Sequence, residues 1–294
     1  MAMECRTMQK SLLVTLRDIT SCSQGVRFVS SFFHNSRNIE LTLFYLVSRL
    51  VAEQQVSELW DDAGGNNMAL PSGAEKAFAL CRSVLLKKGF SEEQIKKVTR
   101  RMQAGTIQDI IHEAQNSLYD AVILGKRSTS FVEDIICGNK GHELLEKELA
   151  TPVWFCRDPE EGRKDVLVCL DGSEMGEKVA DHVGYIVQGE EQHGITLFHA
   201  DKGQGVDKRK MFDRVVEIFA SYGIGAARIR HVVVKPLLGV GSAILAESDK
   251  GSYAAIAMGS KGRTAHKGMY EKIVGSKCKN VFDEIDKAVL WLVP

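Results

Sequence analysis

The chain has 294 residues, a length that predicts two domains at the usual domain size of about 100–200 residues. Its composition, 44% hydrophobic and 26% charged, is that of an ordinary globular protein and excludes disordered or low-complexity architectures. The 38 basic and 38 acidic residues give no formal net charge, and neither half of the chain has the large basic surplus typical of nucleic-acid binding. General binding of DNA or RNA is therefore disfavoured, because it depends on an excess of cationic side chains.

Cysteine usage and hydropathy indicate the cellular compartment. The seven cysteines include no Cys-x-x-Cys pair, and several lie within apolar runs, where a free thiol behaves as a small hydrophobic group. The first residues contain Glu4 and lack the apolar core of a signal peptide. The most apolar window, 41–52, is too short to span a bilayer and contains Arg49. We expect a cytoplasmic protein without a disulfide framework or a metal site.

In the first half of the chain, short apolar runs alternate with segments of helical period. The expected strands are rich in Val, Ile and Leu and comprise 11–16, 39–47, 121–125 and 152–156. A further strand is expected at 95–101, although Ser91 to Gln94 just before it also fits a helix capping box. The stretch 51–73 contains Gly-Gly-Asn-Asn and Pro-Ser-Gly and is an expected loop, within which 51–60 also fits a short helix.

The second half repeats this alternation after a polar stretch, 157–164, which we expect to be a linker. Its five expected strands are 166–170, 195–200, 227–234, 254–259 and 288–293. Helical periodicity predicts helices over 174–188, 211–222, 242–248 and 272–285, the third with Ser242 as its N-cap. The run Lys208 to Lys210 is an expected solvated face.

The two halves look like copies of one unit. SLLVTL (11–16) resembles DVLVCL (165–170), and YDAVILGK (119–126) resembles YAAIAMGS (253–260). The offset between the copies falls along the chain, which places about twenty additional residues in the first copy, within 51–73. The internal repeat therefore predicts a tandem protein.

Continuous apolar strands that alternate with helices indicate a parallel sheet covered by helices on both faces. The predicted fold class is α/β, with two tandem doubly wound domains. We expect the domains to cover 1–157 and 164–294.

Candidate ligand-binding residues follow two strands of the second copy. In an open doubly wound sheet, ligands bind beyond the carboxyl ends of the strands, near the point where the strand order reverses. The segments expected there are Leu170-Asp171-Gly172-Ser173, Met258-Gly259-Ser260-Lys261-Gly262-Arg263 and Gly275-Ser276-Lys277. Glycines let backbone amides approach an anion, and a helix N-terminus offers unpaired N–H groups. A Gly-x-x-Gly pair alone is more often a plain turn, but its place after a parallel strand favours phosphate binding.

These segments resemble the universal stress protein family, as a tandem of two such domains that covers essentially the whole chain. The strongest matches are KDVLVCLDGSEMGEKVADHV (164–183), YAAIAMGSKGRT (253–264) and VGSK (274–277). The resemblance implies a five-stranded parallel sheet in each domain, with strand order 3-2-1-4-5. ATP-binding members of that family carry an Asp after strand one and a Gly-x2-Gly-x9-Gly-(Ser/Thr) motif after strand four.

The resemblance also implies a ligand and the residues that hold it. The ligand would be an adenine nucleotide (ATP, ADP or AMP), with or without Mg²⁺, bound by the second copy. Asp171, flanked by Leu170 and Gly172, would hold the adenosine side, and Ala200 would border the adenine. The ribose and phosphates would lie against Met258, Gly259, Lys261, Gly262, Arg263, Gly275, Ser276 and Lys277. We expect no catalytic residues.

Both copies depart from the motif. In the second copy, the spacer from Arg263 to Val274 has twelve residues rather than nine, so it either bulges outward or moves Gly275-Ser276 away from the phosphates. In the first copy, the pattern reads Gly125-x2-Ser128-x9-Gly138-Asn139, and Arg17 or Asp18 stands at the Asp position. We therefore expect the first copy to be the weaker nucleotide site, with a structural or regulatory role.

Three functions remain open on this basis. The leading one is a stress-response regulatory or protective protein in which nucleotide binding alters stability and association with partners, with at most slow ATP hydrolysis. The alternative is an interaction scaffold that binds no nucleotide. The third is an adenylating enzyme or ATP pyrophosphatase, which is disfavoured because the chain shows no catalytic constellation. His199 would either contact the ligand or be a hydrogen-bonded structural residue.

Family members commonly pair their domains through the fifth strands. The corresponding segments here, 152–156 and 289–293, are short and apolar. An unpaired strand edge is a liability for a protein, so we expect the two segments to pair within one chain. The chain would then be an intramolecular pseudo-dimer that can dimerise again, without nucleic-acid or membrane partners.

Overall fold

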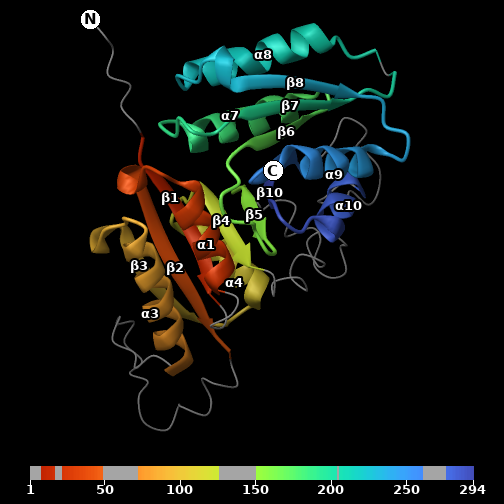
Figure 1. The fold of residues 1–294 in the computed structure, drawn as a ribbon. Helices are drawn as coiled ribbons and strands as arrows, with labels where there is room; N and C mark the ends of the chain where they lie inside the picture. The colour runs from red at the N-terminus through yellow and green to blue at the C-terminus, as the bar shows by residue number, and fades with distance from the viewer. Residues whose placement is uncertain (1–7, 17–21, 49–71, 126–149, 204, 261–275) are drawn as a thin grey trace, which may run out of the picture.

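Strands and helices alternate twice along the chain in the computed structural model, which describes residues 8–16, 22–48, 72–125, 150–203, 205–260 and 276–294 (Figure 1). The first half contains β1 (Lys10–Leu16), α1 (Cys22–Phe32), β2 (Ile39–Val47), α3 (Ser72–Lys87), β3 (Ile95–Arg101), α4 (Thr106–Asn116), β4 (Ala121–Gly125) and β5 (Val153–Cys156). The second half contains β6 (Val166–Leu170), α7 (Glu174–Val187), β7 (Ile195–Ala200), α8 (Lys208–Ser221), β8 (Ile229–Val234), α9 (Val240–Gly251), β9 (Ala255–Gly259), α10 (Ser276–Glu284) and β10 (Val289–Val293).

All ten of these strands form one sheet, in the order β3-β2-β1-β4-β5-β10-β9-β6-β7-β8. Within each half the strands are parallel and follow the expected order 3-2-1-4-5, so the predicted fold class is confirmed. The halves meet where β5 and β10 pair antiparallel, with Trp291 opposite Trp154. The expected pairing of the two fifth strands within one chain is therefore also confirmed.

Helices cover both faces of the sheet, as the apolar character of the strands predicts. One hydrophobic core lies under α1, α3, α7 and α8, and the other lies under α4, α9 and α10. Successive strand residues alternate between these cores: Val166 and Val168 belong to the first and Leu167 to the second. Both cores extend across the β5–β10 pairing and include residues from the two halves. Among the described residues, no helix is long and apolar enough to cross a membrane.

The weakest strand prediction is confirmed, and so is the capping box beside it. Residues 95–101 form β3, and the capping box at Ser91 and Gln94 closes a single 3₁₀ turn, Glu92–Gln94, just before the strand. Gln94 donates to the Ile39 carbonyl oxygen at the start of β2. The capping signal therefore marks a turn that positions the edge strand.

Several predicted boundaries are wrong. The structure begins α3 at Ser72, inside the expected loop; the rest of that loop, 51–71, lies outside the described residues. It also begins α8 at Lys208, because the Asp207 side chain accepts from the Lys210 N–H and caps the helix there. The charged run is thus a first helical turn. Ser242 is not an N-cap: α9 begins at Val240 after Gly239, whose φ of +103° is a conformation that favours glycine.

Aromatic side chains fill the junction of the two halves. The rings of Trp154 and Trp291 stack with their centroids 4.2 Å apart and their planes 8° from parallel. Phe28 of α1 and His182 of α7 each present an edge to both indoles. Aromatic side chains from both halves thus cover the pairing between β5 and β10.

The turn after α7 adds polar contacts to this junction. The buried Lys10 ammonium donates to the Gln188 carbonyl oxygen at 2.9 Å, and burial lowers the pKa of Lys10. The Glu190 carboxylate accepts from the backbone N–H groups of His34 and Asn35, just beyond the end of α1. Buried charged and polar groups of one half therefore depend on partners in the other half, which makes the contact between the halves specific.

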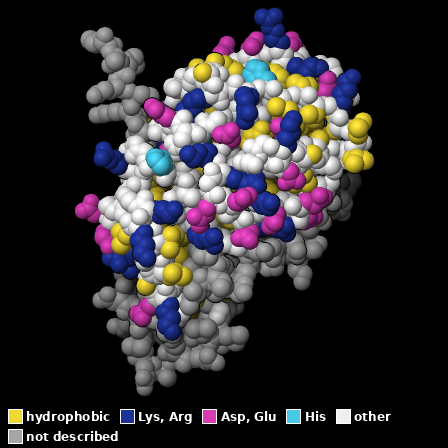
Figure 2. All heavy atoms as spheres, in the orientation of Figure 1, with side chains coloured by type: hydrophobic (Ala, Val, Ile, Leu, Met, Phe, Trp, Pro, Cys, Tyr) yellow, Lys and Arg dark blue, Asp and Glu magenta, His cyan; other side chains and the backbone are white. Residues whose placement is uncertain are grey.

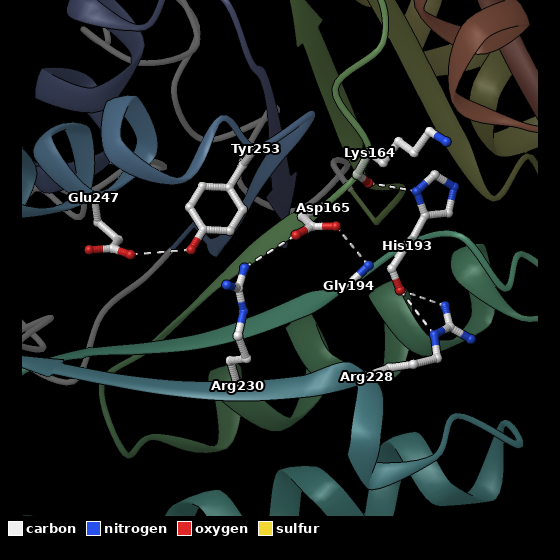
Figure 3. A network of polar contacts seen from close by, with 8 residues as sticks. All are labelled: Lys164, Asp165, His193, Gly194, Arg228, Arg230, Glu247 and Tyr253. Atoms are coloured by element: carbon white, nitrogen blue, oxygen red, sulfur yellow. Dashed lines mark hydrogen bonds and ion pairs between the residues drawn. The ribbon is translucent and has the colours of Figure 1, made fainter.

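A second polar network joins the amino ends of the strands in the second half (Figure 3). One oxygen of the Asp165 carboxylate accepts from the Gly194 N–H at 2.8 Å, and the other accepts from Arg230 at 3.2 Å. Arg228 donates to the His193 carbonyl oxygen, and the His193 ring lies 2.6 Å from the Lys164 carbonyl oxygen. This network fixes the starts of β6, β7 and β8 at the end of the sheet opposite the candidate ligand site.

We expect Gly194→Ala to lower stability by about 1–3 kcal/mol, the usual cost of overpacking. A Cβ at Gly194 would lie only 2.8 Å from the Asp165 carboxylate, which cannot move away without losing its bonds to Gly194 and Arg230. Thermal unfolding of both variants is the measurement. Gly225→Ala is the matched control, because a Cβ there meets open space and φ is an ordinary −70°. Equal melting temperatures for the two variants would contradict the steric argument.

Candidate functional site

The candidate site lies at the carboxyl ends of β6 and β9. These strands are parallel neighbours, and β7 pairs with the other side of β6. From β6 the chain continues to β7 and β8 on one side, whereas β9 and β10 lie on the other, so the strand order reverses between β6 and β9. This reversal is the position at which doubly wound sheets bind ligands.

A tight turn presents Asp171 directly after β6. Its Oδ1 accepts from the Ser173 N–H at 3.1 Å and from the Ser173 hydroxyl at 2.5 Å. Gly172 has φ of +79°, and a Cβ there would lie 2.8 Å from a methyl group of Val206. Glycine is thus required both for the backbone conformation and for packing against the β7–α8 loop. The turn holds the Asp171 carboxylate in one position at the start of α7.

The first turn of α10 is tied to the end of β9. The Cys278 thiol donates to the Gly259 carbonyl oxygen at 3.2 Å and is buried. Cys169 precedes Leu170 on the neighbouring strand β6, and burial, with a smaller contribution from Cys278, raises the pKa of its thiol. These thiols belong to the wall of the site, where they pack as small apolar groups.

His199 is a structural residue rather than an exposed ligand contact. Its ring is buried, and Nδ1 lies 2.9 Å from the Leu170 carbonyl oxygen, so that an N–H there joins the ends of β7 and β6. Next to Ala200, the Asp201 carboxylate accepts from the Lys208 ammonium at 2.5 Å. This hydrogen bond is the main cause that holds the pKa of Asp201 below its usual value.

The structure brings six of the predicted site residues to this edge of the sheet. Leu170 and Met258 are buried in the two cores, whereas Gly172 is exposed and the others are half-buried; the six are Leu170, Asp171, Gly172, Ala200, Met258 and Gly259. Ser276 and Lys277 begin α10, and their side chains are outside the description. Lys261, Gly262, Arg263 and Gly275 lie outside the described residues, as do Arg17, Asp18 and residues 128–139 of the first half.

Three residues without an assigned role contribute to the site: Ser173, Val206 and Cys278. The Asp-x-Ser spacing indicates a side-chain turn of this kind, so the contact of Ser173 with Asp171 carries a local sequence signal. Val206 and Cys278 approach the site only through tertiary packing, and no local pattern marks them. Within the described residues, no group of three or more His, Cys, Asp or Glu side chains could hold a metal ion.

The charge distribution around the molecule is mixed. Figure 2 shows basic and acidic side chains interspersed over the face it presents, in keeping with equal numbers of the two in the chain. Any positive potential at the candidate site would therefore be local, from the helix N-termini that follow β6 and β9.

Comparison with known protein structures shows which fold the chain has. The architecture defines a tandem of two doubly wound α/β units that share one sheet. A universal stress protein from Archaeoglobus fulgidus DSM 4304 aligns over 96% of this chain and 97% of its own, with a TM-score of 0.58 and 15% identity. A putative universal stress protein from Pseudomonas aeruginosa UCBPP-PA14 aligns over 97% of this chain and 93% of its own, with a TM-score of 0.55 and 16% identity.

The chain therefore has the two-domain universal stress protein fold, which the sequence resemblance predicted. No family model matches the chain, and no curated protein matches it. At this level of identity, the solved structures establish the fold, and the function has to be argued from the site.

Proposed function

We propose that the chain is a tandem universal stress protein whose second half binds an adenine nucleotide at the carboxyl ends of β6 and β9. The observation that carries this proposal is the Asp171-Gly172-Ser173 turn, which fixes a carboxylate at the point where the strand order reverses. Nucleotide binding would change stability and partner association, and so serve a regulatory or protective role under stress.

The chemistry of the residues fits the parts of a nucleotide. A carboxylate such as Asp171 can accept from a ribose hydroxyl or an adenine amino group. The helix N-termini of α7 and α10 offer backbone N–H groups and a positive dipole end for phosphates. The cationic side chains Lys261, Arg263 and Lys277 would add charge neutralisation, by the resemblance to the family motif.

The test is a calorimetric titration of nucleotide-free protein with Mg-ATP, repeated with ADP and AMP. We expect one site per chain, and at least a tenfold weaker affinity in Asp171→Ala. Loss of a hydrogen bond between a charged group and the ligand accounts for about 1.5–3 kcal/mol. Saturating ATP should also raise the melting temperature of the unmodified protein.

Asp213→Ala is the matched control, because Asp213 is an exposed carboxylate that pairs with Arg209 across one turn of α8, far from the β6 and β9 carboxyl ends in sequence. Its affinity should equal that of the unmodified protein. Two sites per chain would assign nucleotide binding to the first half as well. The absence of both heat and thermal stabilisation would exclude this proposal and favour the scaffold, for which the longer Arg263–Val274 spacer is the supporting observation.

A further inference from the structure

His182 lies at the junction of the two halves and accepts a hydrogen bond there. Trp154 Nε1 is 3.1 Å from His182 Nε2, and both side chains are buried. The histidine is on α7 in the second half, whereas the tryptophan is on β5 in the first. The bond therefore joins the halves directly above the β5–β10 pairing.

The partners in this bond fix the protonation state of the ring. An indole N–H can only donate, so His182 Nε2 has to be the acceptor and cannot carry a proton. The ring is then neutral, with its proton on Nδ1. Protonation of Nε2 would turn an acceptor into a donor that faces another donor, and it would leave a charge buried among aromatic rings.

Among the described residues, no charged group is near enough to the ring to oppose this effect. At the junction, the rings of Trp154 from β5 and Trp291 from β10 lie against His182. Phe28 of α1 is also in T-shaped contact with both indoles. Burial alone lowers the pKa of His182 to about 3. His193, 11 residues further on, also has a pKa lowered mainly by burial, although Glu190 and two backbone carbonyl groups oppose this shift and Arg228 adds to it.

We propose that His182 makes the junction acid-sensitive, because it binds a proton only when the β5–β10 pairing opens and the Trp154 bond breaks. The device would loosen the tandem along this pairing at acidic pH. This inference does not depend on nucleotide binding.

The direction of the pH effect follows from the difference in the pKa of His182 between the closed and the open junction. The pKa of His182 is lower in the closed junction than in the open one, where it returns toward about 6.5. The closed junction is therefore fully favoured above that pH and is progressively disfavoured as the pH falls toward 3. Because one proton is taken up on opening, the opening equilibrium constant should rise by up to about tenfold per pH unit, or roughly 30-fold between pH 7.5 and 5.0.

The test is backbone hydrogen exchange of the full chain between pH 7.5 and 5.0, corrected for the intrinsic pH dependence of exchange. We expect the protection of β5 and β10 to fall by roughly 30-fold, while β2 and β7 stay within about threefold. In His182→Gln, an amide oxygen can still accept from Trp154 but cannot be protonated, so the change at β5 and β10 should stay within about threefold.

His182→Phe serves as a second variant in case the glutamine destabilises the fold, and in it too the change at β5 and β10 should stay within about threefold. His231→Gln is the control, because His231 stacks on Phe212 at the far edge of the second half. It should retain the full dependence on pH. Constant protection in the unmodified chain, or an unchanged slope in both His182 variants, would overturn the proposal.

Discussion

A chain that ends at Asp286 is expected to be insoluble or unfolded, whereas a chain that ends at Val293 should behave like the full-length protein. The shorter chain lacks β10, whose five residues are between 0 and 5% exposed. Each buried side chain of this kind contributes about 1.5–3 kcal/mol, so their loss costs on the order of 10 kcal/mol. That is comparable with the whole stability of a typical domain.

Removal of β10 would also expose new strand edges. β5 pairs with β4 on one side and with β10 on the other, and β9 pairs with β10 as well. Without β10, the apolar edges of β5 and β9 would be free to pair with other chains. Size-exclusion chromatography and circular dichroism after expression are the measurements. A monomeric, fully folded chain ending at Asp286 would show that the pairing of β5 with β10 contributes little.

Replacement of the two stacked tryptophans by phenylalanine should have unequal effects, although both side chains are fully buried. Trp154→Phe leaves the buried His182 acceptor without a donor, whereas Trp291 Nε1 has no hydrogen-bond partner within the described part of the chain. An unsatisfied buried polar group costs about 1–3 kcal/mol. We expect Trp154→Phe to be the less stable variant by that amount, in addition to the loss of packing that both variants share.

Urea unfolding at pH 7.5 would measure the two free energies of unfolding. The decisive control introduces each replacement separately into a His182→Phe background. In that background the histidine acceptor is absent, so neither replacement can leave it unpaired. The difference between the two variants should then nearly vanish, as expected for residues that interact directly. If the difference in free energy of unfolding persists in that background, packing alone accounts for it and the hydrogen bond to His182 does not.

The fold follows from patterns that are local in the sequence. Strands such as 166–170 are continuous apolar runs, and their alternation with helical segments leaves few topologies open. The repeat then predicts that both halves have the same strand order. Helix starts were less predictable, since Asp207 and Gly239 set them through capping and backbone conformation rather than through hydrophobic period.

The site was predictable where it depends on a short motif. Asp171 and Gly172 could be identified because a carboxylate and a glycine follow a buried strand. The turn itself is local, since the Ser173 N–H donates to the Asp171 carboxylate two residues earlier. Val206 contacts Gly172 from 34 residues away and Cys278 contacts Gly259 from 19 residues away, so these contacts depend on how the loop and helix pack. The aromatic junction was predicted only as a strand pairing; the bond between Trp154 and His182 requires the tertiary structure.

The position of β10 at the centre of the sheet has a consequence for synthesis of the protein. β5 is complete at Cys156, but its partner follows roughly 140 residues later in the chain. At the usual pace of translation, the apolar edge of the first half would stay uncovered for on the order of 10 s. We therefore expect the nascent first half to be the stage at which this protein most needs protection by the ribosome surface or a chaperone.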